Sequence, residues 1–267
     1  MEEFEYIIRT DLAVQKKVLK NTKSYKLGNI TVKKFYSKSF NYVNIIFDNI
    51  EFDETKKDIK KIIIKELQRY LFKYKLNRDD SLLVVGLGNR RVASDSLGSL
   101  VIDNVLATGY VSDLNINSKL RPVYTFIPGI LKNTGYESFR SVKALVKELK
   151  PDFLIVVDSL ISGSVDYLNK LIQITDEGII PGSGISNYQE EISFKTLGVP
   201  VIVIGVPTAT FASTIIRDAL NKKEDTIKYK TGYDLVVSSK DIDYFVNDIS
   251  VLIGKAINET FNNFNIF

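Results

Sequence analysis

The sequence predicts an α/β protein with a mostly parallel sheet and helices on both faces. Short, fully apolar runs rich in valine and isoleucine occur at residues 82–85, 153–157 and 201–204. Such runs are typical of strands that are buried on both faces. Amphipathic segments with apolar side chains at helical spacing lie between them. Strands that alternate with helices in this way predict a parallel sheet between two layers of helices.

A β-hairpin and a long helix are predicted before the first of these strands. Residues 28–35 and 42–47 are rich in β-branched and aromatic side chains and flank a polar connection, which predicts an N-terminal β-hairpin. Residues 54–75 carry apolar side chains at helical spacing with lysine and glutamate between them. The segment 6–15 has apolar residues on both sides of Thr10 and Asp11, and its simplest interpretation is a terminal strand or helix packed on the domain.

The remaining elements follow the same alternation. Helices are predicted at residues 97–110, 139–149, 209–220 and 240–259, and a short strand at 123–127. The charged and polar segment 221–232 predicts a loop. No linker divides the chain, so we expect a single domain over residues 1–267.

The composition excludes several classes of enzyme. The chain has no histidine and no cysteine. The chain therefore cannot form a Ser-His-Asp triad, a Cys-His dyad, a disulfide or a histidine-ligated metal site. A hydrolase of this composition must take its acid-base chemistry from carboxylates, lysine or tyrosine, and paired carboxylates are the usual solution.

Charge and hydropathy argue against nucleic acid and membranes as binding partners. The formal net charge is only +4 and the basic residues are spread out, so we expect no direct contact with nucleic acid. The lysine-rich face of 54–75 is most simply a solvated surface. The sequence has no apolar run of about 18 residues and no charged-then-apolar leader, so we expect a soluble cytoplasmic protein that does not contact a membrane.

Residues 82–88 predict a strand that runs into a glycine-rich turn. Gly86 and Gly88 let the backbone turn tightly. Either Ser94 or Asp95 can cap the helix that follows. Asp95 is thus expected just beyond the carboxyl end of a strand, which is the edge where open α/β sheets hold their sites.

A second aspartate, Asp158, directly follows the apolar run 153–157. A carboxylate in this position is either a helix cap or a functional group at the edge of the sheet. In a parallel sheet, Asp95 and Asp158 could meet at one edge. Two carboxylates placed close together cannot both ionise cheaply, so such a pair divides the roles of acid and base.

The loop at residues 178–184 contains three glycines and a proline, which marks special backbone geometry. Its backbone N–H groups could cradle an anion. No Gly-Lys-Ser/Thr sequence follows, so the loop is not a Walker loop and phosphate binding is disfavoured.

Six motifs, taken together and in this order, resemble the germination protease (spore protease) family of endospore-forming bacteria. They are residues 8–14, 85–89 with 95–98, 150–153 with 157–160, 172–176, 181–184, and 196–202 with 205–208. The resemblance is densest from about residue 82 to residue 212 and recurs at the N-terminus.

The resemblance implies an atypical aspartic endopeptidase that degrades small acid-soluble spore proteins during germination and uses no cofactor or metal. Its essential carboxylates would be Asp95 and Asp158. It further implies a core related to the hydrogenase-maturation endopeptidases, a tetrameric assembly, and a location in the cytoplasm of the forespore and spore core. The enzyme would be made as a zymogen that cuts itself between Asp11 and Leu12, which makes residues 1–11 a candidate propeptide.

Six further residues are expected in the substrate-binding or site loops. They are Gly86, Gly88, Asn89, Gly182, Ser183 and Gly184. The chain departs from the family pattern at Arg90, Arg91, Ser94, Gly163 and Ile180. These departures concern substrate contacts and assembly more than the aspartate pair.

Two other functions stay open at this point. The same carboxylates could serve a metal-directed maturation endopeptidase, although such enzymes usually add a histidine that this chain lacks. Alternatively, the departures could have disabled the site and left a spore protein that only binds its partners. Dependence on a metal ion separates the first alternative from an aspartic peptidase, and peptide cleavage separates both from the second.

Overall fold

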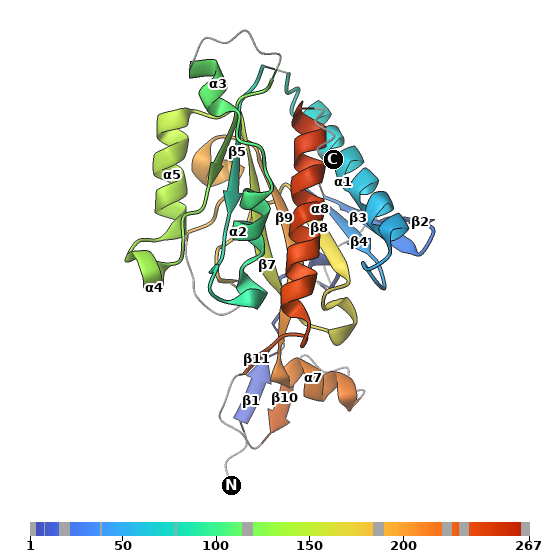
Figure 1. The fold of residues 1–267 in the computed structure, drawn as a ribbon. Helices are drawn as coiled ribbons and strands as arrows, with labels where there is room; N and C mark the ends of the chain where they lie inside the picture. Colours follow the sequence, from blue (N-terminus) through green and yellow to red (C-terminus); the bar gives the residue numbers. More distant parts are fainter. Residues whose placement is uncertain are drawn as a thin grey trace.

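Within the residues that the structure describes, a nine-stranded mixed sheet forms the centre of the protein (Figure 1). The computed structural model describes residues 4–7, 9–15, 22–37, 39–77, 79–113, 120–183, 190–220, 226–229 and 235–262. The strands of this sheet are β2 (Thr22–Leu27), β3 (Ile30–Tyr36), β4 (Asn41–Ile46), β5 (Leu82–Gly86), β6 (Val123–Phe126), β7 (Phe153–Ser162), β8 (Leu171–Thr175), β9 (Val201–Phe211) and β11 (Val236–Val237).

The strand order is β2-β3-β4-β8-β9-β7-β5-β6, and β11 pairs with the end of β9. Strands β6, β5, β7 and β9 are parallel to one another. The predicted hairpin forms as β3 and β4, and β8 lies antiparallel to both β4 and β9. The sheet is therefore mixed, and the prediction of a mostly parallel sheet is wrong in this respect, because the hairpin joins the sheet through an antiparallel β8.

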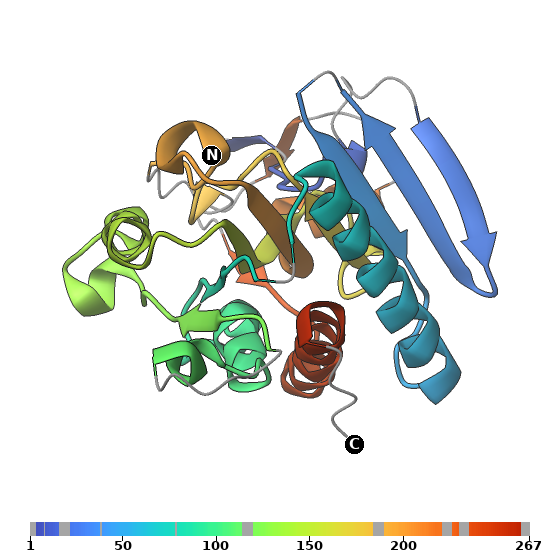
Figure 2. The same cartoon turned by 90° about the horizontal axis from the view of Figure 1, so that it is seen from above.

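Helices cover both faces of the sheet, as predicted (Figures 1 and 2). The helices are α1 (Asp53–Lys73), α2 (Leu97–Asp103), α3 (Gly109–Asp113), α4 (Leu131–Thr134), α5 (Ser138–Leu149), α6 (Phe194–Leu197), α7 (Ala212–Ala219) and α8 (Ile242–Asn262), and short 3₁₀ turns are η1 (Ala13–Gln15), η2 (Ala93–Asp95) and η3 (Val165–Tyr167). Helices α1, α2 and α8 pack on one face, and α5 packs on the other.

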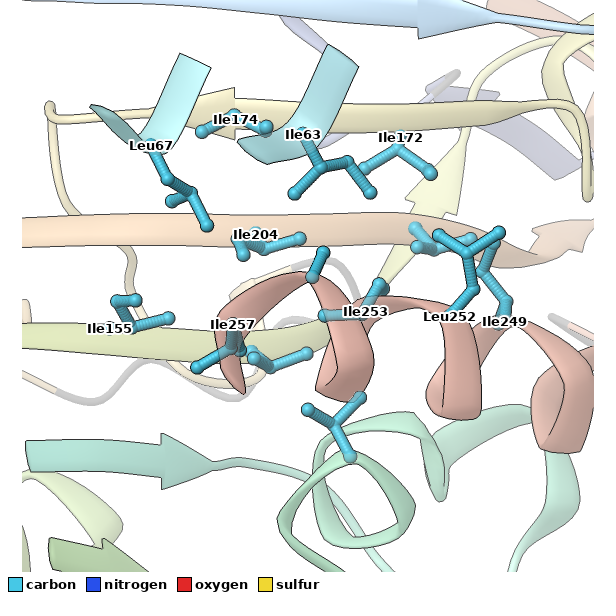
Figure 3. Packing of buried hydrophobic residues seen from close by; sticks show 14 of the residues in the cluster. Ile63, Leu67, Ile155, Ile172, Ile174, Ile204, Ile249, Leu252, Ile253 and Ile257 are labelled. Carbon is cyan, nitrogen blue, oxygen red and sulfur yellow. The ribbon is translucent and has the colours of Figure 1, made fainter. Parts of the chain in front are cut away.

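The core lies between the sheet and these helices. On the first face, Ile63 of α1 and Ile253 of α8 pack over the apolar side chains of the central strands, among them Ile204 (Figure 3). On the second face, Phe139 of α5 packs against Leu83 and neighbouring strand residues. Alternate residues of the same strands feed the two faces, which explains why the central strands are apolar throughout.

Several element boundaries differ from the prediction. The helix predicted at 97–110 is divided into α2 and α3, and the loop predicted at 221–232 contains strand β10 (Thr226–Tyr229). Strand β10 pairs with β1 (Phe4–Ile7) in a separate antiparallel sheet. The segment 6–15 combines the end of this strand with the turn η1.

Candidate active site

A cavity of about 790 Å³ opens beside the carboxyl end of β5, between strands β7 to β9 and the loop around residue 180. Its lining includes Asp95 and Asp158, so the structure brings the two aspartates together in one cavity. Other predicted site residues also line it: Asp11, Gly88, Asn89, Gly182 and Ser183. Gly184 lies outside the described residues, and Gly86 is not part of the lining.

Asp158 lies within β7 and not after it. Strand β5 ends at Gly86, which pairs with Val157, while β7 continues to Ser162. Asp158 thus stands at the level where its neighbouring strand stops. Its side chain is buried, with the residue 7% exposed, and its Oδ1 accepts a hydrogen bond of 2.9 Å from the Ser159 N–H. Burial raises the pKa of Asp158 well above its ordinary value, and the nearby carboxylates of Asp95 and Asp11 raise it further.

Asp95 closes the 3₁₀ turn η2 between β5 and α2. Neither Ser94 nor Asp95 caps α2, because the N-cap position is Ser96, whose side chain makes no capping hydrogen bond. Instead, Oδ2 of Asp95 accepts a hydrogen bond of 2.9 Å from the Asn89 N–H. Burial raises the pKa of Asp95 to about 6, although the Asn89 N–H favours the ionised form.

The two glycines of the turn after β5 serve close packing. Gly88 has a φ of +100°, and a Cβ there would lie 2.1 Å from the Asp95 carbonyl oxygen. A Cβ on Gly86 would lie 2.2 Å from the Gly98 carbonyl oxygen, so Gly86 lets β5 approach α2. Gly88 therefore shapes the site directly, and Gly86 acts through the packing of α2.

A bulge in β9 adds a residue that the sequence analysis missed. Strand β9 pairs with β7 through Leu160 opposite Pro207 and then Ile161 opposite Ala209, which leaves Thr208 without a cross-strand partner. The fully buried Thr208 donates a hydrogen bond of 2.5 Å from Oγ1 to the carbonyl oxygen of Ser94. Bulges often re-aim a side chain beside a site. The proline inside an apolar strand run was the available signal, since proline is confined to edges and bulges.

The N-terminal segment also contributes to the cavity. Thr10 and Asp11 line it. The Asp11 N–H donates to the Ile161 carbonyl oxygen (3.0 Å), and the Ile161 N–H donates to Oδ2 of Asp11 (2.8 Å). The Ser183 hydroxyl donates to Oδ1 of Asp11 (3.1 Å). Leu12 is fully buried in an apolar cluster that includes Leu160.

The positions that depart from the family pattern are spread around the cavity. Ser94 and Ile180 line it, whereas Arg90 forms a surface ion pair with Asp103. Gly163 contacts the N-terminal segment, because a Cβ there would lie 2.9 Å from the Cβ of Thr10. The glycine thus leaves room for this segment.

The described residues offer neither a metal centre nor a membrane-spanning helix. They contain no group of three or more histidine, cysteine, aspartate or glutamate side chains placed to hold a metal ion. None of the helices in this part of the chain combines the length and the apolar character needed to cross a membrane.

The α/β fold places one buried aspartate, Asp158, and one partly buried aspartate, Asp95, in a single cavity, which is the arrangement of a candidate acid-base site. Residues 8–224 match the sequence profile of the germination protease, and the chain belongs to the germination protease family. The germination protease of Clostridium tetani is 33% identical over an alignment that covers 94% of this chain and 94% of that protein.

Other relatives are longer. The germination protease of a Geobacillus species is 38% identical over 73% of this chain and 55% of its own length, and that of Bacillus subtilis is 39% identical over 63% of this chain and 46% of its own length. The chain therefore spans about half the length of these relatives. Among solved structures, the [NiFe] hydrogenase maturation protease HycI of Thermococcus kodakarensis is similar, with a TM-score of 0.35, 16% identity, and coverage of 67% of this chain and 93% of that one.

Proposed function

We propose that this protein is an endopeptidase in which Asp95 and Asp158 form the acid-base pair. The observation that carries the proposal is the presence of both carboxyl groups, each with a raised pKa, in the lining of one cavity. Carboxyl groups with raised pKa values in a cavity are the expected tools of acid-base catalysis at mildly acidic to neutral pH.

The different surroundings of Asp95 and Asp158 indicate which one acts as the acid and which one acts as the base. Asp158 is the more strongly buried and faces two other carboxylates, so it retains its proton and acts as the acid. Asp95, with a pKa raised to about 6, is ionised at neutral pH and acts as the base. Because the two groups interact, their titration belongs to the pair as a whole.

Peptide hydrolysis by this pair takes place in two steps. Asp95 takes a proton from a water molecule while the water oxygen bonds to the carbonyl carbon of the peptide. Asp158 donates its proton to the carbonyl oxygen, which gives a neutral tetrahedral intermediate. When this intermediate collapses, the C–N bond breaks and the leaving nitrogen takes the proton held by Asp95. The new carboxyl group returns a proton to Asp158, so the pair is restored.

The proposed substrates are small acid-soluble spore proteins, degraded during germination, and membership of the germination protease family supports this assignment. We further propose that the chain is made as a zymogen whose residues 1–11 are removed by cleavage between Asp11 and Leu12. The position of Asp11 in the lining of the cavity supports self-processing. We also propose that the protein assembles as a homo-tetramer in the spore core.

Digestion of a purified small acid-soluble spore protein tests the assignment. Asp95→Asn and Asp158→Asn should each abolish cleavage, because asparagine preserves shape but cannot exchange the proton. Asp176→Asn is the matched control, since Asp176 is also buried (8% exposed) but does not line the cavity. Near-normal cleavage by either of the first two variants would contradict the proposal.

A further inference from the structure

A row of residues that runs across the sheet connects Asp158 to strand β8. Asp158 of β7 lies opposite Gly205 of β9, Gly205 lies opposite Gln173 of β8, and Gln173 lies opposite Asn44 of β4. Residues paired across strands point to the same face of a sheet. Gln173 therefore points to the same face as Asp158, and it lines the same cavity.

The side-chain amide of Gln173 contacts the N-terminal segment at two backbone groups. Its Oε1 accepts a hydrogen bond of 2.7 Å from the Ala13 N–H, and its Nε2 donates to the Asp11 carbonyl oxygen at 3.4 Å. These two groups stand on either side of Leu12, and the Asp11 carbonyl belongs to the Asp11–Leu12 peptide bond. One buried amide (Gln173 is 5% exposed) thus spans this bond.

The glycine in the row shapes the space between Asp158 and Gln173. A Cβ on Gly205 would lie 2.4 Å from Cδ1 of Leu160, so the glycine leaves room for the Leu160 side chain. Leu160 in turn belongs to the apolar cluster that buries Leu12. The side chain that follows the spanned bond is therefore held by packing, while the backbone on both sides is held by Gln173.

Strand β7 holds the other side of the segment. Beyond Val157, where β5 has ended, Ile161 exchanges hydrogen bonds with the backbone N–H and the side chain of Asp11. The segment is thus fixed between the edge of β7 that β5 leaves unpaired and the Gln173 amide. Three of these contacts use only backbone groups of the segment, which any peptide in the same position could supply.

We propose that Gln173 is a substrate-positioning residue that holds the peptide backbone across the bond to be cleaved. Its ligand is an extended peptide, bound through the carbonyl of the cleaved bond and the N–H of the second residue after that bond. This inference rests on the proposed peptidase function and on cleavage between Asp11 and Leu12. Gln173 does not exchange protons with the aspartate pair, so its removal should slow cleavage without moving the pH dependence.

The test follows the rate of self-cleavage of the full chain by mass spectrometry across a range of pH. Gln173→Met removes both hydrogen bonds at similar side-chain volume and should slow the rate roughly 10- to 100-fold, the effect of two lost hydrogen bonds. The pH at which the rate is half-maximal should stay unchanged. A normal rate, or a loss accompanied by a displaced pH profile, would overturn the proposal.

Asn44→Leu is the matched control. Asn44 is fully buried in the same row, and its amide has no hydrogen-bond partner among the described residues. Replacing it with an apolar side chain of similar size should change the rate by no more than about twofold. A loss as large as that of Gln173→Met would show that any buried amide in this row matters equally, and would contradict a specific role for Gln173.

A second variant tests the contact from the side of the substrate, without altering the sheet. Ala13→Pro removes the N–H that donates to Gln173, and Ala13 begins the turn η1, where the fixed φ of proline is tolerated. This variant should also cleave more slowly, and adding it to Gln173→Met should cause little further loss, because Gln173→Met has already removed the bond from the Ala13 N–H. Independent, multiplying losses would overturn the proposal.

The outcomes separate this inference from the proposed function. If the wild-type chain cuts a spore protein but never its own Asp11–Leu12 bond, the inference about Gln173 is wrong and the peptidase function stands. If the wild-type chain cuts nothing, the proposed function is wrong and the inference falls with it.

Discussion

The two aspartates of the site, Asp95 and Asp158, differ from the buried Asp176 in how their charge is satisfied. Asp176 accepts hydrogen bonds from the Asn41 N–H and the Tyr74 hydroxyl, and it forms an ion pair with Lys73. Asp95 and Asp158 form no ion pair within the described part of the chain, and each accepts one backbone N–H. Asp176 joins elements together, whereas the other two carry the cost of burial without a cation, which is the pattern expected of functional carboxyl groups.

The cost of that burial gives a prediction on stability and pH. The ordinary pKa of aspartate is 3.8, and the pKa of Asp95 is about 6 in the folded protein. Between these values the folded state retains a proton that the unfolded state has lost, so the contribution of Asp95 to stability is fully present below pH 3.8 and is lost as the pH rises through 6. Asp95→Asn should therefore unfold at a higher temperature than the wild type at pH 7.5, with a gain of at most about 3 kcal/mol.

Thermal denaturation of both proteins at pH 7.5 and at pH 3.5 checks this expectation. The advantage of Asp95→Asn should largely disappear at the lower pH, because Asp95 is then protonated in the folded state and mostly protonated in the unfolded state. A constant difference between the two proteins at both pH values would mean that the substitution acts through packing and not through the charge of Asp95.

Among the elements, the ends of the central strands decide the geometry of the site. The apolar runs 153–157 and 201–204 predict where β7 and β9 lie but not where they end. Both strands continue past these runs, because their later residues alternate between the core and a cavity that accepts polar side chains. Asp158 was therefore expected at the end of a strand and instead lies inside one.

The residues that reach the site through the register between distant strands could not be predicted from the sequence. Asp95 and Asp158 were predicted from their positions after strands and from the resemblance to a family. Gln173 and Thr208 reach the site only through the pairing of β8 with β9 and through the bulge in β9, which local sequence does not specify. The exposed side chains of β2 similarly gave no alternating pattern that would predict a strand.

The hydrogen bond from Thr208 in the bulge supports the turn that carries Asp95. Thr208→Val keeps the shape but removes the hydroxyl that donates to the Ser94 carbonyl, which leaves a buried acceptor without its partner. We expect the turn that carries Asp95 to loosen and peptide cleavage to fall roughly 10-fold, with a stability loss of about 1–3 kcal/mol. Cleavage assays and thermal denaturation measure the two effects.

Thr208→Ser is the control for the bulge, because serine keeps the hydroxyl and loses one methyl group. It should restore most of the cleavage rate that Thr208→Val loses. If serine and valine lower the rate equally, then packing of the methyl group, and not the hydrogen bond to Ser94, accounts for the role of Thr208.

At the scale of the whole molecule, the composition sets the chemistry that is available. The chain contains no histidine and no cysteine anywhere in its sequence. Transition metals bind most firmly through these side chains, so the proposed peptidase should not depend on such an ion. Prolonged treatment with a chelator should leave cleavage of a spore protein unchanged, and loss of activity that one added metal ion restores would favour a metal-directed endopeptidase instead.

The N-terminal part of the chain runs from strand β1 to the cavity that holds the aspartate pair. Strand β1 pairs with β10 at one end of the protein (Figure 1). A few residues further on, Thr10 and Asp11 line the cavity that holds Asp95 and Asp158. Asp11 lies close enough to Asp158 for its charge to raise the pKa of that group. A proton on Asp11 would weaken this repulsion, whereas Asp95 must stay ionised to act as the base, so we expect self-cleavage at mildly acidic pH near 6 and a loss of cleavage at lower pH.

Sequencing the N-terminus after incubation at mildly acidic pH tests whether Asp95 and Asp158 together cleave the Asp11–Leu12 bond. The wild-type chain should acquire a new N-terminus at Leu12, and neither Asp95→Asn nor Asp158→Asn should do so, because each lacks one member of the acid-base pair. An active wild-type enzyme that keeps Met1, or an aspartate variant that still cuts at Leu12, would contradict the account.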